Sequence, residues 1–479
     1  MNTDSKIAII GAGVEGLAAA KYFKKHCLNE IILFDQRETD DAVLAESLAD
    51  LPLGVRVYGG ADYLEKAAIC DVLVRSPGIH IEKVKAALRK MKRTDAVTVT
   101  STTQYFMENC PYLMIGVTGT KGKGTTSTLI TLMLKEAGYS VYLGGNIGQS
   151  PLEFLDEMQE NSIAVLEMSS FQLQDLRISP QIAVVLRVTS DHLDYHKNVE
   201  EYRAAKSATV RFQEPNNLAI FNEDYDDFEQ YADQTPARKL TVSTRNPVEA
   251  GAYVEEGEIV FVPASEDSEL AELQIVGEVG KVALIGAHHL ENVLPAVCVA
   301  RSLNVPISAI QKVLYSFAGL PHRLEFAKEI DGVKYYNDSF STTPDTSVAA
   351  SYAFKNPVIL IAGGSEKFAD YKEWGIELQK NPRLKMVLLM GQTAPKMEEA
   401  LNLAASEIGK SGHESAEIRH SPLAVYRCKN LEEALMKARE NAVFGDVVVM
   451  SPAAASFDQF KNYKQRGEQF KELVKKIAR

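Results

Sequence analysis

The residues with the clearest chemical potential lie in a glycine-rich stretch, Gly116–Gly124. An apolar run before it, Tyr112–Ile115, is typical of a buried strand, and Thr125–Leu132 after it begins a helical pattern. Glycines in such a turn let backbone N–H groups converge on phosphate oxygens, and the helix N-terminus adds the positive end of its dipole. Lys123 can reach the β- and γ-phosphates of a nucleotide. The stretch therefore predicts an ATP-dependent enzyme.

This loop departs from the usual pattern G-x-x-x-x-G-K-[ST] at two positions. Val117 stands where the first glycine falls and Gly124 where the hydroxyl belongs, so Thr125 is the expected Mg²⁺ ligand. The simpler alternative is a glycine-rich connection with one exposed lysine, but the flanking strand and helix favour a phosphate loop. The residues expected to hold ATP here are Gly119, Thr120, Lys121, Gly122, Lys123, Gly124, Thr125 and Thr126.

A second glycine motif lies near the N-terminus. Gly11–Gly16 reads G-x-G-x-x-G between the apolar strand Lys6–Ile10 and the helical run Leu17–Phe23, and Asp35 ends the next strand. Taken alone this motif indicates NAD binding. Beside a separate ATP loop it indicates a Rossmann-like domain that holds the phosphates of some nucleotide.

Two expected strands in the middle of the chain lead into acidic residues. Ile163–Leu166 is followed by Glu167, and Ile182–Leu186 is followed by Arg187–Asp194. A carboxylate at a strand end beside a phosphate loop is where a Mg²⁺ ligand is needed. Strands also end in capping acids, so a purely structural role stays open for these residues.

The C-terminal region repeats this alternation of strands and helices. Val358–Ala362, Met386–Met390 and Val447–Met450 are apolar and end in small or polar loops, which predicts a binding edge at the carboxyl ends of a parallel sheet. An amphipathic helix is expected over Phe457–Ile477. Before this region, Lys239–Ile285 has the short strands and Glu- and Gly-rich turns of a small antiparallel flank.

Composition narrows the class of protein. A chain of 479 residues predicts two to four domains. The net charge of −12 argues against a non-specific nucleic-acid binder, and there is no apolar run long enough for a membrane helix. Five cysteines without pairing or metal spacing are typical of a reducing compartment, and Met1 leads directly into a strand without a signal peptide. A cytoplasmic enzyme is expected.

Eight stretches of the chain, taken in order, resemble the Mur ligases of peptidoglycan synthesis, and most closely the members that join D-glutamate to UDP-N-acetylmuramoyl-L-alanine. Each stretch alone is a weak signal, but eight in family order are strong. They are Gly119–Lys123, Gly145–Gly148, Leu166–Leu173, Asp191–Asp194, Tyr202–Lys206, Gly319–Arg323, Asn337–Ser339 and Ser451–Phe460.

The resemblance implies an α/β fold with three domains, in which two Rossmann-like domains flank a central P-loop ATPase domain. The expected ranges are 1–110 for the UDP-sugar, 111–318 for ATP and 319–479 for the amino acid. It also implies a reaction. The carboxylate of the UDP-linked substrate attacks the γ-phosphate of ATP to give an acyl phosphate, and the amino group of glutamate then displaces phosphate. The expected partners are these small molecules, with no nucleic acid and no membrane insertion, and the enzyme is expected to be a monomer.

Catalytic and metal-binding roles follow from the same resemblance. Lys123 would steady the transferred phosphoryl group. Two Mg²⁺ sites are implied, with Thr125, Glu167, His192 and Lys206 as the ligand positions. Lys206 matches a lysine that the family carbamylates with CO₂, a change that turns a cation into an anion beside Mg²⁺. A plain surface lysine is the simpler alternative for this position.

The resemblance also assigns substrate contacts in all three expected domains. They are Asn292, Arg323 and Asp338 for the base and ribose of ATP; Gly13, Asp35, Arg37, Asn146 and Ser169 for the UDP-linked substrate; and Thr342, Lys367, Ser456 and Tyr463 for the amino acid.

Some positions depart from the pattern of the glutamate ligases. The sequence Lys123-Gly124-Thr125 carries an extra glycine that looks like folylpolyglutamate synthase, and Arg187 stands where the family has Asn. Phe340 stands where these ligases usually have Lys, close to the amino-acid site. The loss of that cation leaves both D- and L-glutamate open as the incoming residue.

Three other hypotheses therefore remain. A folylpolyglutamate-type ligase is disfavoured by the Gly11–Gly16 domain, which that family lacks. A degenerate, non-catalytic relative is disfavoured because Lys123, Glu167, His192 and Lys206 are all present. A dinucleotide-dependent dehydrogenase would rest on Gly11–Gly16 alone.

Overall fold

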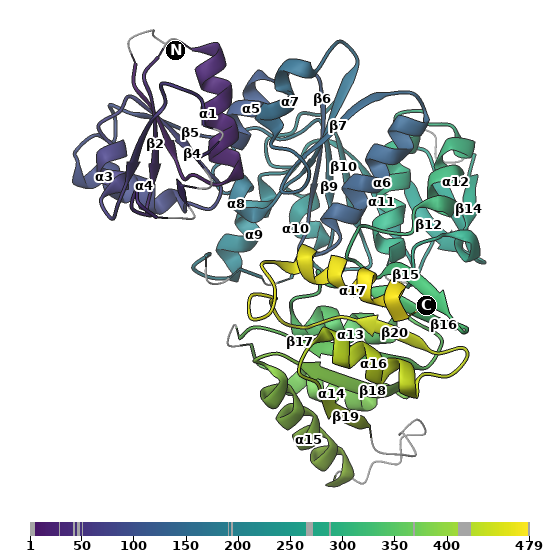
Figure 1. Ribbon diagram of the computed structural model, residues 1–479. Coiled ribbons are helices and arrows are strands. Elements are labelled where there is room, and N and C mark those ends of the chain that lie inside the picture. The colour runs from purple at the N-terminus through teal and green to yellow at the C-terminus, as the bar shows by residue number, and fades with distance from the viewer. Residues whose placement is uncertain are drawn as a thin grey trace. The chain divides into compact units, whose positions relative to one another are not determined.

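The computed structural model describes residues 5–27, 29–41, 44–45, 48–49, 51–189, 191–192, 195–264, 272–286, 289–366, 369–410 and 423–477. The chain forms two compact units (Figure 1). The first consists of residues 1–281 and 288–315, and the second of residues 282–287 and 316–479. Two β-sheets lie in the first unit and one lies in the second.

The N-terminal sheet has five parallel strands in the order β3-β2-β1-β4-β5. Ile7 and Ile9 of β1 pack with Phe23 on one face, and Ala8 and Ile10 pack on the other, so helices cover both faces as in doubly wound folds. The strands are β1 (Ile7–Ile10), β2 (Ile31–Asp35), β3 (Arg56–Gly59), β4 (Val72–Arg75) and β5 (Thr98–Ser101), and the helices are α1 (Val14–His26), α3 (Tyr63–Ala67), α4 (Ile81–Lys90) and α5 (Thr102–Asn109).

The central sheet has nine strands in the order β14-β13-β12-β11-β10-β9-β6-β8-β7. Pairing is parallel from β7 to β12 and antiparallel from β12 to β14, so the predicted antiparallel flank continues the main sheet. The strands are β6 (Leu113–Thr118), β7 (Ser140–Gly145), β8 (Ser162–Glu167), β9 (Ile182–Val185), β10 (Leu218–Asn222), β11 (Arg238–Ser243), β12 (Gly251–Glu255), β13 (Glu258–Val262) and β14 (Gln274–Glu278). The helices are α6 (Lys123–Glu136), α7 (Pro151–Phe154), α8 (Ser170–Leu173), α9 (Val199–Ser207), α10 (Phe228–Ala232), α11 (Leu290–Ser302) and α12 (Ile307–Ser316).

The sheet of the second unit has the order β15-β16-β20-β17-β18-β19, with only the β15–β16 pair antiparallel. Buried side chains of β17 alternate between two cores, which places helices on both faces. The elements are β15 (Glu325–Ile330), β16 (Val333–Asn337), α13 (Pro344–Tyr352), β17 (Val358–Gly363), α14 (Lys372–Lys380), β18 (Leu384–Met390), α15 (Ala394–Lys410), β19 (Ala424–Arg427), α16 (Leu431–Asn441), β20 (Val447–Met450) and α17 (Tyr463–Ile477). The three strands predicted from apolar runs in this region are confirmed.

The last helix begins later than the sequence pattern predicts. The expected start was Phe457, but α17 starts at Tyr463. The side-chain oxygen of Asn462 accepts a hydrogen bond from the backbone N–H of Gln465 at 2.9 Å, which is the geometry of an N-cap. Among the helices that the structure describes, none combines the length and the apolar character that a membrane span requires.

Within the first unit, a buried arginine connects the N-terminal sheet to the central one. Arg75 at the end of β4 is fully buried. Its Nε and one terminal nitrogen donate to the two oxygens of Asp175, at 2.9 and 2.5 Å, and it also donates to the carbonyl of Phe171 at 3.0 Å. The charge of Arg75 is therefore neutralised by a residue 100 positions further along the chain.

We expect Asp175→Ala to lower the free energy of unfolding by about 3 kcal/mol, because it leaves the buried guanidinium without its counter-ion. Denaturant titration followed by circular dichroism measures this change. Asp156→Ala is the matched control, since Asp156 pairs with the exposed Lys25 and its loss should cost no more than about 1 kcal/mol. Equal effects of the two variants would contradict a special role for the Arg75 pair.

Candidate active site

The glycine loop lies at the carboxyl end of β6, between that strand and α6, as predicted. Gly119 and Gly122 have φ angles of 146° and 86°, which favour glycine, and Gly122 is the N-cap of α6. The Nζ atom of Lys123 donates to the carbonyls of Gly119 and Thr120, both at 3.0 Å. Two carbonyls of the loop therefore contact the amine of its own lysine. The loop also leads into the N-terminus of α6, and a helix N-terminus is suited to bind the phosphates of a nucleotide.

Asn292, one of the expected ATP contacts, packs directly against this loop. The hydroxyl of Thr126 lies 3.3 Å from the Asn292 backbone oxygen and 3.4 Å from its side-chain oxygen. A Cβ atom on Gly122 would lie 2.0 Å from that side-chain oxygen. Thr125 and Thr126 are both buried. The residues from Gly122 to Thr126 therefore pack closely against α11.

Lys206 lies at the other side of the loop and is 1% exposed. Its Nζ atom donates to the carbonyl of Gly119 at 2.8 Å and to the Thr118 hydroxyl at 3.3 Å, and it lies 4.8 Å from the centre of the Tyr202 ring. Burial, reinforced by the charge of Lys123, holds the pKa of the Lys206 amine well below its ordinary value. This lysine is therefore no surface residue, and its amine has an increased tendency to be neutral.

Glu167 ends β8 at the same edge of the sheet and is 4% exposed. The amide nitrogen of Asn146 donates to its carboxylate at 2.7 Å, which brings together two of the predicted site residues. Both Glu167 and Asp191 counteract the lowering of the Lys206 pKa, so their charges act on that amine. Asp191 also lies 3.8 Å from Lys121.

His192 follows Asp191 in the loop after β9. Its Nε2 atom lies 3.8 Å from the Asp191 carboxylate, and its ring centre lies 4.8 Å from that of Phe171. Its φ angle of 54° is uncommon for a residue with a side chain and is often found at functional sites.

The predicted contacts of the N-terminal sheet are arranged around Asp35. Its carboxylate accepts hydrogen bonds from the backbone N–H of Ala12 at 2.8 Å and from Arg37 Nε at 2.8 Å. Burial alone would favour the protonated acid, but the hydrogen bonds from Arg37 and Ala12 lower the pKa of Asp35. Gly13 is the N-cap of α1, and a Cβ atom added to it would have no heavy-atom neighbour within 4 Å. Ser169 caps α8 by accepting a hydrogen bond from the backbone N–H of Gln172, whose side chain donates to Glu15 of α1 at 3.1 Å.

Arg323 and Asp338 belong to the second unit, whereas Asn292 belongs to the first. Asp338 is buried and accepts hydrogen bonds from the Leu324 N–H at 3.1 Å and from the Ser451 hydroxyl at 2.7 Å. Burial raises the pKa of Asp338 to about 6. The guanidinium of Arg323 lies 4.1 Å from the centre of the Phe340 ring.

The predicted amino-acid contacts lie in loops of this second unit. Ser456 is buried, Thr342 is half-buried ahead of α13, and Tyr463 opens α17. The ring of Phe340 also meets that of Tyr463 edge-on, at 4.9 Å between centres. Lys367 lies outside the described residues.

Arg466 was not predicted from the sequence, yet it organises these loops. It is fully buried in α17 and donates to the carbonyls of Ser339, Ala454 and Ala455 at 2.9 to 3.1 Å, and to the Ser339 hydroxyl at 3.0 Å. Burial lowers the pKa of Arg466 to about 10, so it stays charged at neutral pH. Its basic side chain in an amphipathic helix gave no signal that distinguished it from a surface arginine.

Known proteins are similar to this chain over nearly its whole length. The model of the Mur ligase middle domain matches residues 117–300, and that of the "Mur ligase, glutamate ligase domain" matches residues 322–454. A UDP-N-acetylmuramoylalanine--D-glutamate ligase of Acetivibrio thermocellus is 36% identical over 480 aligned positions, which cover 99% of this chain and 97% of the relative. The protein of the same name from Clostridium novyi is 32% identical, with 99% and 97% covered.

The chain belongs to the Mur ligase family.

Solved structures agree on the fold. The UDP-N-acetylmuramate-alanine ligase MurC from Thermotoga maritima has a TM-score of 0.57 at 17% identity, covering 99% of this chain and 100% of that chain. MurF ligase from the same organism, in complex with ADP, also has a TM-score of 0.57, at 18% identity, covering 99% and 96%. The predicted α/β fold of the Mur ligases is therefore confirmed, whereas the boundaries at residues 110 and 318 stay predictions.

As a Mur ligase, the chain is an ATP-dependent amide ligase, and the family uses ATP with Mg²⁺. The residue types at the predicted ligand positions would suit this hard cation, because they offer a carboxylate from Glu167 and a hydroxyl from Thr125 with one imidazole, from His192. A positively charged Lys206 would not suit a neighbouring Mg²⁺, but a neutral or negatively charged group at that position would. The residues present therefore fit the metal, on the condition that Lys206 loses its charge.

Gly122→Ala should disrupt the phosphate loop. Alanine at a φ of 86° is strained by roughly 1–2 kcal/mol, and its Cβ would meet Asn292 Oδ1 at 2.0 Å. We expect weaker binding of ATP, measured by calorimetry. Gly257→Ala is the control, because Gly257 has a similar φ of 82° with nothing within 4 Å of an added Cβ, so its ATP affinity should equal that of the wild type. Unchanged affinity in Gly122→Ala would contradict the assignment of this loop.

The raised pKa of Asp338 predicts a pH-dependent contribution to stability. Since the folded state holds the proton more tightly than the unfolded state, the contribution is present below the ordinary aspartate pKa of about 4 and is lost as the pH rises to about 6. It amounts to something on the order of 2–3 kcal/mol. We therefore expect wild-type stability to fall over this range by more than that of Asp338→Asn, measured by denaturant titration at several pH values. Parallel curves of stability against pH for the wild type and Asp338→Asn would contradict this contribution of Asp338.

Proposed function

We propose that this Mur ligase joins glutamate to UDP-N-acetylmuramoyl-L-alanine, with conversion of ATP to ADP and phosphate, in the synthesis of peptidoglycan precursors. The relatives named D-glutamate ligases support this substrate, since they align over nearly the whole length of both chains. The observation on which the proposal rests most is the buried Lys206 amine, 2.8 Å from the phosphate-loop carbonyl of Gly119. A purely nucleotide-binding relative would have no use for a buried amine at this point.

In the proposed reaction a carboxylate oxygen of the UDP-linked substrate attacks the γ-phosphorus of ATP, and ADP leaves. Lys123 and the N-terminus of α6 neutralise the charge that develops on the phosphoryl oxygens. The amino group of glutamate then attacks the acyl carbon, phosphate leaves, and the amine gives up a proton. The protein contributes alignment and charge neutralisation, since phosphorylation itself makes the leaving group good.

Magnesium would be held near the loop by Glu167, His192, Thr125 and a carbamylated Lys206, in two sites. Lys206 reacts in its neutral form. Its nitrogen bonds to the carbon of CO₂ and loses a proton, which converts the amine to a carbamate with one negative charge. The lowered pKa of Lys206 supports this step because only a neutral amine has a free lone pair.

Each substrate is assigned mainly to one of the three proposed domains. Residues 1–110, with Gly13, Asp35 and Arg37, would bind UDP, with Asn146 and Ser169 contacting the same substrate from 111–318. ATP would bind 111–318 with Asn292, together with Arg323 and Asp338, and the amino acid would bind 319–479 with Thr342, Lys367, Ser456 and Tyr463. A monomeric state and a cytoplasmic location also stay predictions.

The configuration of glutamate is the least constrained part of the proposal. The relatives named D-glutamate ligases favour the D form. Phe340 favours keeping the L form as a second candidate, since its ring covers Arg323 at 4.1 Å where the glutamate ligases usually have a lysine. A folylpolyglutamate-like activity has less support, because the N-terminal sheet with its Gly11–Gly16 loop has no place in that family.

Phosphate release tests the function directly. We expect release from ATP only when UDP-N-acetylmuramoyl-L-alanine and D-glutamate are both present, with Mg²⁺ and bicarbonate, and at least about tenfold less with L-glutamate. The reverse preference would assign the L form. Release that requires neither substrate, or that requires a folate in place of the UDP-linked acceptor, would contradict the proposal.

Lys206→Ala should reduce the turnover number by at least about 100-fold, because it removes a proposed metal ligand. Small carboxylic acids such as acetate should restore part of the activity of this variant, since a carboxylate can occupy the space of the carbamate. Lys281→Ala, an exposed lysine in the first unit, is the control and should retain wild-type turnover. Full activity in Lys206→Ala would rule out the carbamate.

A further inference from the structure

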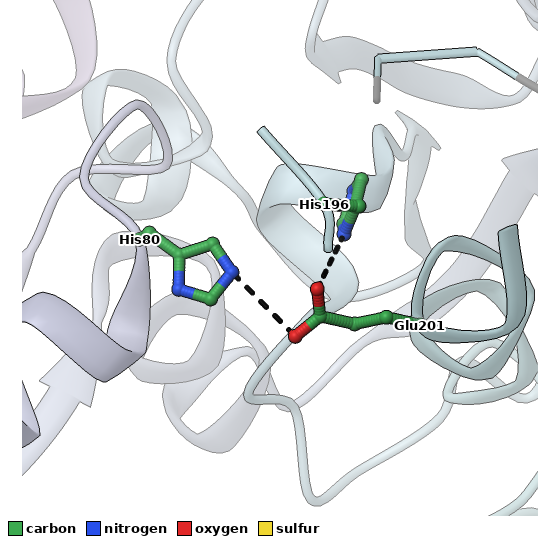
Figure 2. Close-up of side chains that lie close together, drawn as sticks. All are labelled: His80, His196 and Glu201. Carbon is green, nitrogen blue, oxygen red and sulfur yellow. Dashed lines mark ion pairs between the residues drawn. The ribbon is translucent and has the colours of Figure 1, made fainter. Parts of the chain in front are cut away.

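A second cluster of metal-binding side chains lies in the first unit, separate from the proposed Mg²⁺ ligands. It consists of His80, just before α4, of His196, which precedes α9, and of Glu201 in the first turn of α9 (Figure 2). One potential ligand atom from each residue lies within 4.8 Å of the others. Figure 2 shows the Glu201 carboxylate between the two imidazoles, with one oxygen 3.6 Å from His80 Nε2 and the other 3.9 Å from His196 Nδ1.

One of these imidazoles has an unsatisfied nitrogen. His196 is 1% exposed, and its Nε2 atom lies 2.9 Å from the Ser170 hydroxyl. Its Nδ1 atom is buried and has no hydrogen-bond partner, and it faces Glu201 at 3.9 Å, beyond hydrogen-bond distance. Buried polar atoms without a partner are rare and call for an explanation, such as an absent ion.

We propose that His80, His196 and Glu201 form a binding site for a divalent transition metal such as Zn²⁺, through His80 Nε2, His196 Nδ1 and the Glu201 carboxylate. Two imidazoles and one carboxylate, with a fourth position for water, form a common zinc set. The Glu201 side chain is 24% exposed, which gives the ion access. Mg²⁺ prefers oxygen ligands, so this nitrogen-rich set differs in selectivity from the proposed Mg²⁺ ligands.

Binding requires the three side chains to move closer together and to exchange hydrogen bonds. Bonds of about 2.0–2.1 Å to a tetrahedral ion bring the ligand atoms to roughly 3.4 Å from one another. The separations of 3.6 and 3.9 Å, which involve the two different oxygens of Glu201, must shorten, and so must any longer separation among ligand atoms that lie within 4.8 Å of one another. Glu201 Oε2 also accepts a hydrogen bond from the Lys197 N–H at 2.6 Å. His80 Nε2 now lies 2.6 Å from the Gln174 amide nitrogen, and its Nδ1 accepts from the Glu82 N–H at 3.2 Å. Coordination replaces the first contact and places the imidazole proton on Nδ1, which removes the second. Coordination therefore has to displace contacts that the fold already makes.

The position of the cluster links it to the proposed active site. Glu201 lies in the first turn of α9, and Lys206 lies in the last turn of the same helix. The backbone N–H of His196 donates to the carbonyl of His192 at 2.9 Å. An ion held here would tie the segment before α4 to the segment that carries His192 and Lys206, whatever reaction the enzyme catalyses.

Titration of the full-length chain with Co²⁺ tests the proposal, because Co²⁺ in a tetrahedral site gives visible d–d absorption. Excess Mg²⁺ is present throughout to occupy oxygen-rich sites. We expect one strongly absorbing site that Zn²⁺ displaces. His80→Gln, His196→Gln and Glu201→Gln should each weaken Co²⁺ binding by at least about tenfold. His26→Gln, which affects an exposed histidine paired with Asp156, is the matched control and should leave binding unchanged.

Two further variants distinguish Co²⁺ binding at this site from binding at the proposed Mg²⁺ ligands. Gln174→Ala leaves all three ligands in place and frees His80 Nε2, so it should tighten Co²⁺ binding. Glu167→Gln should leave it unchanged. Circular dichroism confirms that each variant is folded. Absence of tetrahedral absorption, or a signal that depends on Glu167 but not on His80 and Glu201, would overturn the proposal without touching the proposed ligase reaction.

Discussion

The buried amine of Lys206 is the constraint on which the organisation of this active site depends. An ammonium group held at 1% exposure, beside a second lysine, is costly unless it is paired or neutral. Its two hydrogen-bond partners, Gly119 O and Thr118 Oγ1, are uncharged. Burial and the charge of Lys123 therefore shift the Lys206 amine toward its neutral form, and Asp191 and Glu167 oppose this shift. Only the neutral form can react with CO₂, and a carbamate would place a negative charge beside the phosphate loop.

Parallel strand pairing explains why the phosphate loop and the Glu167 carboxylate lie at the same edge of the central sheet. In the central sheet Val117 of β6 pairs with Glu167 of β8, and Thr118 pairs with Val185 of β9, so the carboxyl ends of three strands lie at one edge. The phosphate loop, the Glu167 carboxylate and the loop that carries His192 leave from that edge. Lys206 reaches it from α9, where its amine donates to the Gly119 carbonyl of the loop. The sheet edge thus brings lysines and carboxylates close together without a bound substrate, and preorganised charges of this kind would suit the proposed phosphoryl transfer.

The parts of this fold that could be predicted from the sequence are those determined by local patterns. Apolar runs followed by glycine-rich, small or polar loops identified β6, β17 and β20, and the loop around Lys123 was evident from its residue types alone. The predicted start of α17 at Phe457 was wrong. Asn462 forms the N-cap, so the helix begins at Tyr463 although the helical periodicity starts earlier in the sequence. What could not be predicted depends on distant pairs: Asp175 neutralises Arg75 from 100 positions away, and Arg466 joins loops that begin at Ser339 and Ala454. For Lys206 the sequence left two interpretations open, a carbamylated lysine implied by the resemblance and a plain surface lysine, and the structure shows that the residue is buried.

The most direct test of this account is ¹³C NMR of the full-length protein equilibrated with ¹³C-labelled bicarbonate. The account predicts one slowly exchanging carbamate resonance that is absent from a Lys206→Arg variant, because arginine keeps its charge and cannot form the adduct. A spectrum without that resonance, or with the same resonance in the variant, would contradict the claim that Lys206 supplies the charge that the active site needs.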